Sequence, residues 1–209
     1  MPQVVSVETM RESDAYTISH GTPSKVLMYR AGRGIYESTQ WKGPVAVVCG
    51  KGNNAGDGYV VADLLREEGI DCEIILLYDK FSQDGKYYYD LCMEHGIRSV
   101  TYRSDLSFDR YSMILDCLLG TGFSGKIEGT MKEVIEKIND SGAYVVSADI
   151  NSRLDGNTGM GETYVKSDLT VSIGTFKYGH FIGLSDTAMK KKINVDIGIQ
   201  IIGPTAVIE

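Results

Sequence analysis

A glycine-rich segment, Gly50–Gly58, follows the apolar run Val45–Cys49 and contains two asparagines and an aspartate. An apolar strand that leads into such a loop before a helix can hold phosphate, because bare backbone approaches closely and its N–H groups point at the ligand. A pyrophosphate needs neither paired amides nor an acid, and a carboxylate in the first helical turn competes with phosphate for the same N–H groups. The segment therefore predicts a polar ligand that carries hydrogen-bond donors, or a nearby cation.

Two later apolar runs also lead into residues that could do chemistry. The run at 112–118 contains Asp116 and precedes a glycine-rich turn, and the run at 143–148 precedes Asp149 and Ser152. Each of these residues on its own is typical of a turn or a helix cap. In a parallel sheet, however, the carboxyl ends of the strands meet at one edge, where ligands bind. Two carboxylates, an asparagine pair and a hydroxyl on that edge together predict a functional site.

Alternating apolar strands and amphipathic helices are expected to position these residues. Near-continuous apolar strands bounded by helices are typical of βαβ units and of a mostly parallel sheet covered on both faces. The chain shows no internal repeat and no low-complexity linker. We therefore expect one doubly wound, Rossmann-like α/β domain over residues 1–209, with two helices before the sheet. The expected helices are 6–18, 23–36, 57–68, 84–95 and 128–140, and the expected strands are 45–49, 73–77, 98–102, 112–118, 143–148, 169–173 and 193–197.

The composition narrows the class of protein. Apolar residues make up 43% and charged residues 23% of the chain, as in soluble globular domains. The formal net charge of −7 disfavours a nucleic-acid-binding surface. The four cysteines show no C-x-x-C spacing, which argues against a metal cluster or a disulfide framework. No apolar stretch reaches the roughly 18 residues that a membrane span needs, and no signal core is present, so we expect a cytoplasmic protein without a membrane partner.

Several ordered segments of the chain resemble one known family. Gly50–Gly58 is similar to the G-x-G-N-N-G-G-D-G signature of the NAD(P)H-hydrate epimerases, the YjeF N-terminal domain family. The resemblance extends along nearly the whole chain and is far more specific than one loop. The other segments that resemble family motifs are Met10–Asp14, Met28–Arg33, Asp116–Gly122, Ser147–Ser152 and Asp196–Ile199.

The resemblance implies a repair enzyme. Such proteins interconvert the R and S forms of hydrated NADH and NADPH, so that a dehydratase specific for one epimer can restore the cofactor. The chain stops soon after the last expected strand, so we expect the dehydratase to be a separate partner protein; a homodimer is a family-level expectation. The substrate-binding residues implied by the family pattern are Asn53, Asn54, Ala55, Gly56, Asp57, Gly120, Thr121, Gly122, Phe123, Ser124, Gly125, Lys126 and Asp149.

The family pattern also implies one potassium ion per subunit, held by Asn54, Asp116 and Ser152 together with backbone carbonyls. Amide, carboxylate and hydroxyl oxygens are the hard donors that such a cation prefers. In epimerisation the hydroxyl beside the ring nitrogen leaves and returns on the other face, or the ring opens and closes, and either route needs a proton shuttle. Asp149 is the predicted acid–base residue, and Lys126 is predicted to assist it or to bind phosphate.

Two alternative functions stay open, one because the sequence departs from the family pattern and one because of Asp79. Asn151 replaces the proline and Arg153 the glycine of the family's D-I-P-S-G. Loss of the proline is expected to free the turn at Ser152, and the Arg153 guanidinium could compete with the cation or reach a 2′-phosphate. These changes favour a non-catalytic nucleotide-binding or scaffold domain of the same fold. A different NAD-linked enzyme is supported only by Asp79, which stands where such folds bind ribose. His180 is expected at the edge of the pocket.

Overall fold

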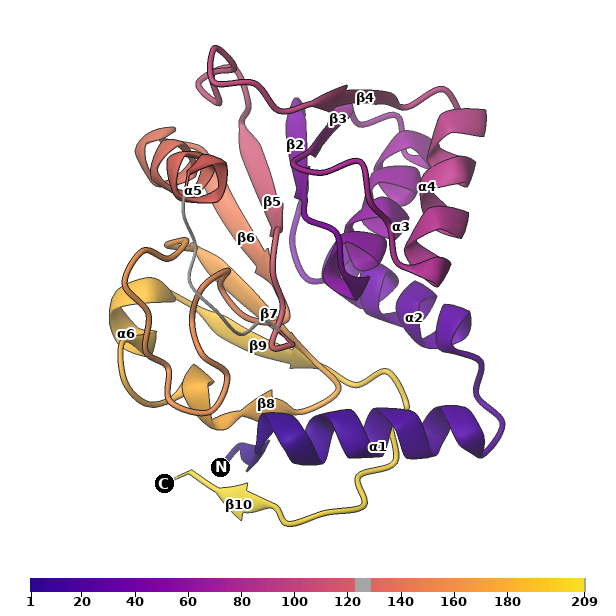
Figure 1. The fold of residues 1–209 in the computed structure, drawn as a ribbon, viewed down its shortest axis with the longest axis vertical. Coiled ribbons are helices and arrows are strands. Elements are labelled where there is room, and N and C mark those ends of the chain that lie inside the picture. The colour runs from indigo at the N-terminus through magenta and orange to yellow at the C-terminus, as the bar shows by residue number, and fades with distance from the viewer. Residues whose placement is uncertain (123–128, 209) are drawn as a thin grey trace.

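Seven strands form the main sheet of the computed structural model, which describes residues 1–122 and 129–208. They are β2 (Val45–Cys49), β3 (Cys72–Leu76), β4 (Arg98–Thr101), β5 (Met113–Cys117), β6 (Tyr144–Ala148), β7 (Leu169–Ile173) and β9 (Lys192–Val195). Their order in the sheet is β4-β3-β2-β5-β6-β7-β9, and every pairing is parallel (Figure 1). The central strands β2 and β5 are buried at every position, as their continuous apolar runs predict.

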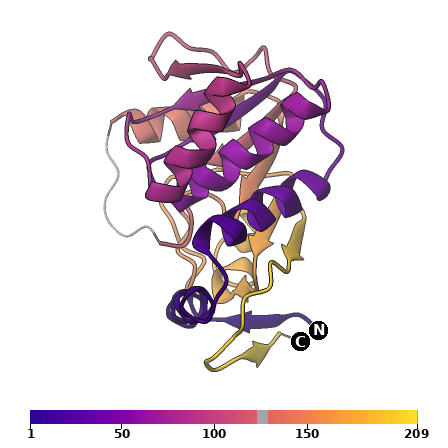
Figure 2. The same cartoon turned by 90° about the vertical axis from the view of Figure 1, so that its right-hand side faces the viewer.

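Helices cover both faces of this sheet. The helices of the described residues are α1 (Val7–Ser19), α2 (Ser24–Glu37), α3 (Asn53–Glu67), α4 (Gln83–Glu94), α5 (Thr130–Asp140) and the short α6 (Ser185–Ala188). Helices α2, α3 and α4 lie side by side on one face, and α5 covers the other (Figure 2). Each face has its own core, in which Leu65 of α3 and Ile135 of α5 are fully buried. The predicted doubly wound α/β fold is confirmed. None of the described helices has the length and apolarity to cross a membrane.

A second, smaller sheet joins the two ends of the chain. β1 (Gln3–Val5) pairs antiparallel with β10 (Ala206–Val207) and parallel with β8 (Phe176–Lys177). Figure 1 shows this sheet beside α1, with both termini close together. The sequence does not predict these strands, because two or three residues are too few for a periodic pattern. Through β8, the small sheet fixes the segment that carries Lys177.

Helix α3 begins at Asn53, whereas the sequence predicts a start at Asp57. The asparagine pair therefore lies in the first helical turn, and Asp57 lies in the second, so the expected competition of Asp57 with phosphate for the first-turn N–H groups does not apply. The glycines of this segment have low helix propensity, but close packing requires them. A Cβ on Gly58 would lie 2.8 Å from the Cys117 sulfur. Tertiary contacts thus extend the helix beyond its local signal.

Candidate active site

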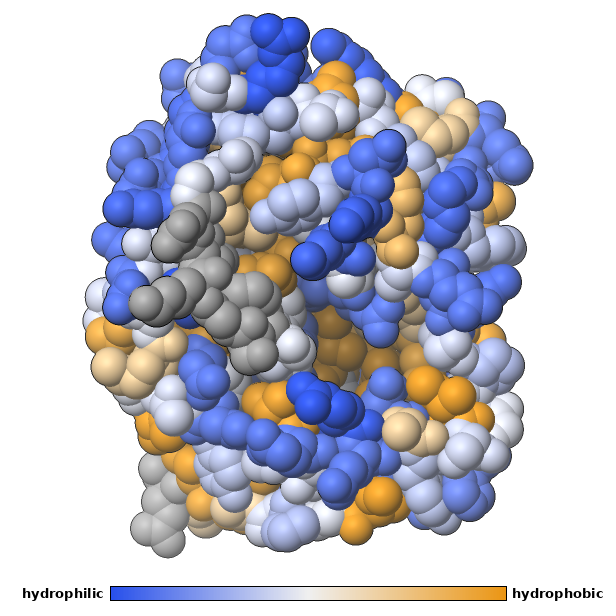
Figure 3. All heavy atoms as spheres, in the orientation of Figure 1, coloured by the Kyte–Doolittle hydropathy of each residue, from blue (hydrophilic) through white to orange (hydrophobic). Residues whose placement is uncertain are grey.

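The candidate site lies where the strand order reverses. From β2 the chain proceeds to β3 and β4 on one side, whereas β5, β6 and β7 extend the sheet on the other. In such sheets the crevice beyond the carboxyl ends of the two central strands binds ligands. The loops after β2 and β5 approach so closely that a Cβ on Gly50 would lie 2.0 Å from the Leu118 carbonyl oxygen. A cavity of about 470 Å³ opens beyond them, and Figure 3 shows this face of the molecule hollowed above α1.

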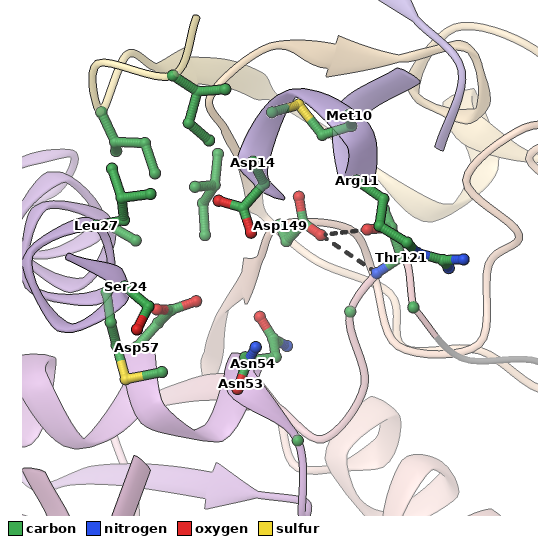
Figure 4. A pocket seen from close by; sticks show the side chains of 18 of the residues that line it. Met10, Arg11, Asp14, Ser24, Leu27, Asn53, Asn54, Asp57, Thr121 and Asp149 are labelled. Atoms are coloured by element: carbon green, nitrogen blue, oxygen red, sulfur yellow. Dashed lines mark hydrogen bonds between the residues drawn. The ribbon is translucent and has the colours of Figure 1, made fainter. Parts of the chain in front are cut away.

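The cavity has a polar wall and an apolar wall. The start of α3 contributes Asn53, Asn54 and Asp57, and the turns after β5 and β6 contribute Thr121 and Asp149 (Figure 4). Such a lining suits a ligand with an apolar ring and several polar groups. The apolar lining comes from α1, α2, β7 and the segment after β9, and consists of Met10, Leu27, Met28, Ala31, Ile173, Ile197 and Ile199.

Asp149 is held in one position by hydrogen bonds from two other segments. Its backbone has a φ of 63°, in the region that non-glycine residues rarely adopt. Carboxylate atom Oδ2 accepts hydrogen bonds from the Thr121 backbone N–H at 3.2 Å and hydroxyl at 2.9 Å. Oδ1 accepts one from the Lys177 ammonium at 2.5 Å. Burial raises the pKa of Asp149, but the Lys177 charge and the hydrogen bonds from Lys177 and Thr121 together lower it more, so that the pKa lies below its usual value and the carboxylate is ionised.

Lys177 and His180 support Asp149 from the segment after β7. Lys177 is 1% exposed and also donates a hydrogen bond to the Ile173 carbonyl oxygen at 2.8 Å. His180 Nδ1 accepts from the Lys177 backbone N–H at 3.0 Å, and Nε2 lies 2.7 Å from the Asp149 carbonyl oxygen, to which it donates. Burial and the Lys177 charge lower the pKa of His180 to about 4, so the ring is neutral.

Lys177 lines the cavity but was not predicted as a site residue. His180 was expected at the edge of the pocket, but it does not line the described cavity; it is fully buried and contacts the backbone of Asp149, which does line it. A signal for Lys177 existed in the sequence. The rule that placed Asp116 and Asp149 at strand ends, applied to the end of β7, also points to the segment 174–180.

Asp57 and Asp14 are two further carboxyl groups that line the cavity with Asp149. Asp57 is 8% exposed, and burial together with the negative charges of Asp149 and Asp14 raises its pKa well above the usual range. Burial also raises the pKa of Asp14, which comes from α1. The environments of Asp57 and Asp149 thus shift their pKa values in opposite directions, an arrangement typical of acid–base pairs in enzymes.

Asp116 and Ser152 form a buried cluster beneath the cavity. The Ser152 hydroxyl donates to Asp116 Oδ1 at 2.5 Å, and the Ser147 hydroxyl donates to Oδ2 at 2.9 Å. Backbone N–H groups of Leu118 and Ser152 add two more hydrogen bonds. Asp116 is fully buried, and burial raises its pKa in spite of these donors. Among the described residues, no lysine or arginine pairs with it.

Asn54 supplies a buried amide that has no hydrogen-bond partner among the described residues. Its oxygen and its nitrogen are both buried and make no hydrogen bond with the described residues. A buried amide without partners is costly, which indicates that a ligand or an ion satisfies it. The amide oxygen of Asn54 and the buried carboxyl group of Asp116 are of the chemical type that a monovalent cation takes as ligands. The described residues contain no group of three or more His, Cys, Asp and Glu side chains that could hold a metal ion.

The turn at Ser152 is held rigidly, although the sequence predicts a freed turn. Asn151 is fully buried, and its amide nitrogen donates to the Val165 carbonyl, the Ser167 hydroxyl and the Ala188 carbonyl. Its oxygen accepts a hydrogen bond from the Thr170 hydroxyl at 2.5 Å. Four hydrogen bonds thus replace the stiffness of a proline ring. The expectation that the Asn151 substitution loosens the site is wrong.

The remaining predicted residues divide into three groups. Gly120 and Gly122 line the cavity, as do Asn53, Asn54, Asp57, Thr121 and Asp149. Ala55 and Gly56 are buried in α3 and do not line the described cavity, and neither do Asp116, Ser152, Arg153 and the exposed Asp79. The predicted residues Phe123, Ser124, Gly125 and Lys126 lie outside the described residues.

Comparisons with known proteins give sequence matches over most of the chain. The family model described as YjeF-related protein N-terminus matches residues 24–179. A protein of Lentilactobacillus buchneri named NAD(P)H-hydrate epimerase is 35% identical over 209 residues, which cover 95% of this chain and 96% of that protein. A protein of Weissella koreensis with the same name is 30% identical and covers 95% of this chain and 93% of its own length.

Longer relatives and a solved structure complete the comparison. A Thermofilum pendens protein named bifunctional NAD(P)H-hydrate repair enzyme Nnr is 35% identical over 78% of this chain, which spans only 34% of that protein. The crystal structure of yeast ynu0, YNL200c, has a TM-score of 0.76 at 20% identity over 89% of this chain and 86% of that one, and confirms the fold. Given the match of the family model and the full-length relatives, the chain belongs to the family of YjeF-related protein N-termini.

Proposed function

We propose that this protein is an NAD(P)H-hydrate epimerase, an isomerase that interconverts the R and S epimers of hydrated NADH and NADPH. The observation that carries the proposal is the ionised Asp149 carboxylate, which faces a cavity at the reversal point of the sheet and is held by Lys177 and Thr121. Full-length relatives bear the name of this activity. The intact acid–base cluster argues against the alternative of a non-catalytic binding domain.

Asp149 is suited to move a proton at the reacting carbon. The hydrated carbon carries a hydroxyl beside a ring nitrogen, and epimerisation requires a proton transfer at that hydroxyl. Lys177 stabilises the ionised form of Asp149, so the carboxylate can accept a proton at neutral pH. Thr121 and His180 orient its side chain and its backbone. Lys126 remains a predicted assisting or phosphate-binding residue.

We further propose that Asn54, Asp116 and Ser152 hold one potassium ion. The support is the unpartnered Asn54 amide and the fully buried Asp116 carboxylate. The ion would supply positive charge that offsets Asp116 and fixes the loops beside the ligand. We expect the melting temperature to rise with added KCl relative to tetramethylammonium chloride, and the rise to be lost in Asn54→Ala.

The bifunctional relatives suggest a partner for this activity. Their names join both repair functions in one chain, of which this protein spans about a third. We propose that a separate NAD(P)H-hydrate dehydratase consumes the epimer that this protein supplies.

We also propose that the protein is a homodimer, which sedimentation velocity can test, and that it is located in the cytoplasm. The four free cysteines agree with a reducing compartment.

The decisive experiment combines the protein with a mixed-epimer preparation of hydrated NADH and an S-specific dehydratase. Rapid and complete consumption of both epimers is expected. If a fraction of the R epimer remains and decays only at its spontaneous rate, the protein is a binding domain without catalysis. Chromatography of the nucleotides at successive times gives both outcomes in one measurement.

A further inference from the structure

The cavity has an excess of acidic groups. Four carboxyl groups line it, and those of Asp14, Asp57 and Asp149 face its interior from α1, α3 and the turn after β6 (Figure 4). The fourth belongs to Asp84 of α4. Three basic side chains also line it: Lys177 is buried and already paired with Asp149, whereas Arg11 and Lys51 are exposed. Such a cavity disfavours an anionic group at its acidic side and stabilises a group that becomes positive.

Asp57 differs from Asp149 in its contacts with the described residues. Asp149 accepts hydrogen bonds from Thr121 and Lys177, whereas the Asp57 carboxyl accepts none from the described residues. Asp57 is more than nine-tenths buried and lies one helical turn from the unpartnered Asn54 amide. A buried carboxyl without a donor or a cation is favoured in its protonated form, in agreement with the raised pKa caused by burial and by Asp149 and Asp14. The Lys177 charge opposes this shift.

We propose that Asp57 is a catalytic acid of this site, which protonates the hydroxyl of the hydrated ring as it leaves, so that epimerisation proceeds through cleavage of the C–O bond and a cationic ring. The inference rests on the proposed epimerase function. It assigns separate tasks to the two carboxyl groups: Asp57 donates the proton, and Asp149 accepts one. The surrounding carboxyl groups stabilise the positive charge that forms between these two steps.

The step balances without a further reactant. The C–O electron pair goes to oxygen, which takes the Asp57 proton and departs as water, while the nitrogen lone pair forms a C=N bond and leaves the ring cationic. Water then adds to the other face of the carbon, the C=N pair returns to nitrogen, and the surplus proton goes to Asp149. Return of that proton to Asp57 through water in the cavity restores the starting state. Ring opening, by contrast, keeps the original oxygen on the carbon.

The two routes differ in the fate of the oxygen, which gives the test. Purified R-epimer of hydrated NADH is mixed with the enzyme in H₂¹⁸O, and the S-epimer is isolated at short times and analysed by mass spectrometry. We expect one ¹⁸O in essentially every newly formed S-epimer. Formation of S-epimer that retains ¹⁶O would overturn the cleavage route while leaving the epimerase function intact. Absence of S-epimer above the spontaneous rate would overturn both.

Two variants of α3 test whether Asp57 is the catalytic acid. Asp57→Asn keeps the shape of the side chain but removes its acidic proton, and the loss of a positioned acid typically lowers a rate by about 10²- to 10⁴-fold. We expect epimerisation to fall at least about 100-fold, with an unchanged or raised melting temperature. The matched control is Asp63→Asn on the same helix, where Asp63 pairs with His95 outside the cavity; its rate should equal that of the wild type. A wild-type rate in Asp57→Asn would overturn the assignment.

Discussion

The ion pair of Asp149 and Lys177 links the stability of the site to its chemistry. Lys177 is almost completely buried, and its ammonium lies 2.5 Å from Asp149 Oδ1. The removal of one partner leaves the other charge buried, which typically costs about 3–5 kcal/mol. A variant of Asp149 therefore changes folding as well as catalysis. The two effects must be separated before a loss of activity is assigned to proton transfer.

We expect Asp149→Asn to abolish epimerisation and to lower the free energy of unfolding by about 3 kcal/mol. Adding Lys177→Met should restore most of this stability, because no charge is then left unpaired, but it should not restore activity. Urea unfolding and the epimer assay measure the two quantities. Wild-type stability in Asp149→Asn would contradict the buried ion pair, and activity in the double variant would contradict the role of Asp149.

His180 predicts a pH dependence of stability. Burial lowers its pKa from 6.5 to about 4, so between these values the unfolded state binds a proton that the folded state does not. The His180 contribution to the free energy of unfolding is therefore complete above pH 6.5 and is lost as the pH falls, at up to about 1.4 kcal/mol per pH unit.

The variant His180→Gln serves as the reference for this measurement. Glutamine can keep a donor for the Asp149 carbonyl and an acceptor for the Lys177 N–H, but it does not titrate. Asp57 has a raised pKa and acts in the opposite direction, yet it is present in both proteins and cancels. Urea unfolding from pH 7 to pH 4 should show a steeper loss in the wild type. Parallel curves would mean that folding does not lower the pKa of His180.

At the scale of elements, the close contact of α2 with α3 positions the polar wall of the cavity. A Cβ on Gly32 of α2 would lie 2.4 Å from Val60 Cβ and 2.7 Å from the Asp57 carbonyl oxygen. Because α3 carries Asn54 and Asp57, any shift of α2 that pushes α3 moves these groups. Glycine at this position thus allows α2 and α3 to pack at the short distance that the site needs.

We expect Gly32→Ala to destabilise the protein by about 1–3 kcal/mol, although alanine favours a helix over glycine by about 1 kcal/mol. The Michaelis constant for hydrated NADH should rise, because Asn54 and Asp57 are displaced. Arg33→Ala is the control on the same helix, since Arg33 is exposed and forms an ion pair with exposed Glu37. Thermal unfolding compares the stability of the two variants, and steady-state kinetics compares their Michaelis constants. If Gly32→Ala is as stable as Arg33→Ala, α2 and α3 can move apart without loss of stability, and the prediction is wrong.

At the scale of the whole molecule, the small sheet connects both termini to the cavity. β10 pairs with β1, and the Ile208 N–H donates to the Pro2 carbonyl oxygen at 3.2 Å. β1 leads directly into α1, whose residues Met10 and Asp14 line the cavity. The same sheet includes Lys177 through β8. Contacts between distant parts of the chain therefore hold one wall of the site.

We expect removal of residues 205–209 to lower the free energy of unfolding by about 1–3 kcal/mol, since two or three hydrogen bonds at about 1 kcal/mol each are lost. The Michaelis constant should rise more than the turnover number falls, because α1 contributes lining rather than the acid–base residues Asp57 and Asp149. Val207→Ala is the control, as Val207 is 58% exposed and its backbone pairing is kept. An unchanged Michaelis constant in the truncated protein would contradict this coupling.

The sequence by itself determined the parallel α/β fold and the edge of the sheet at which Asn54, Asp57 and Asp149 lie. These features follow from local patterns, namely apolar runs, helical periodicity and the residues next to strand ends. The resemblance of ordered motifs also indicated the family, which the relatives confirm.

Only the tertiary structure decided the ionisation of the site and its supporting contacts. Lys177 reaches Asp149 because β6 and β7 are neighbours in the sheet, a fact that the spacing of the two residues in the chain does not contain. Asp57 is buried because α1, α2 and α3 meet around it, and the helix start at Asn53 and the Asn151 hydrogen bonds depend on similar packing. Burial and charge pairing arise from segments far apart in sequence, so the protonation of each carboxyl group cannot be predicted from residue type alone.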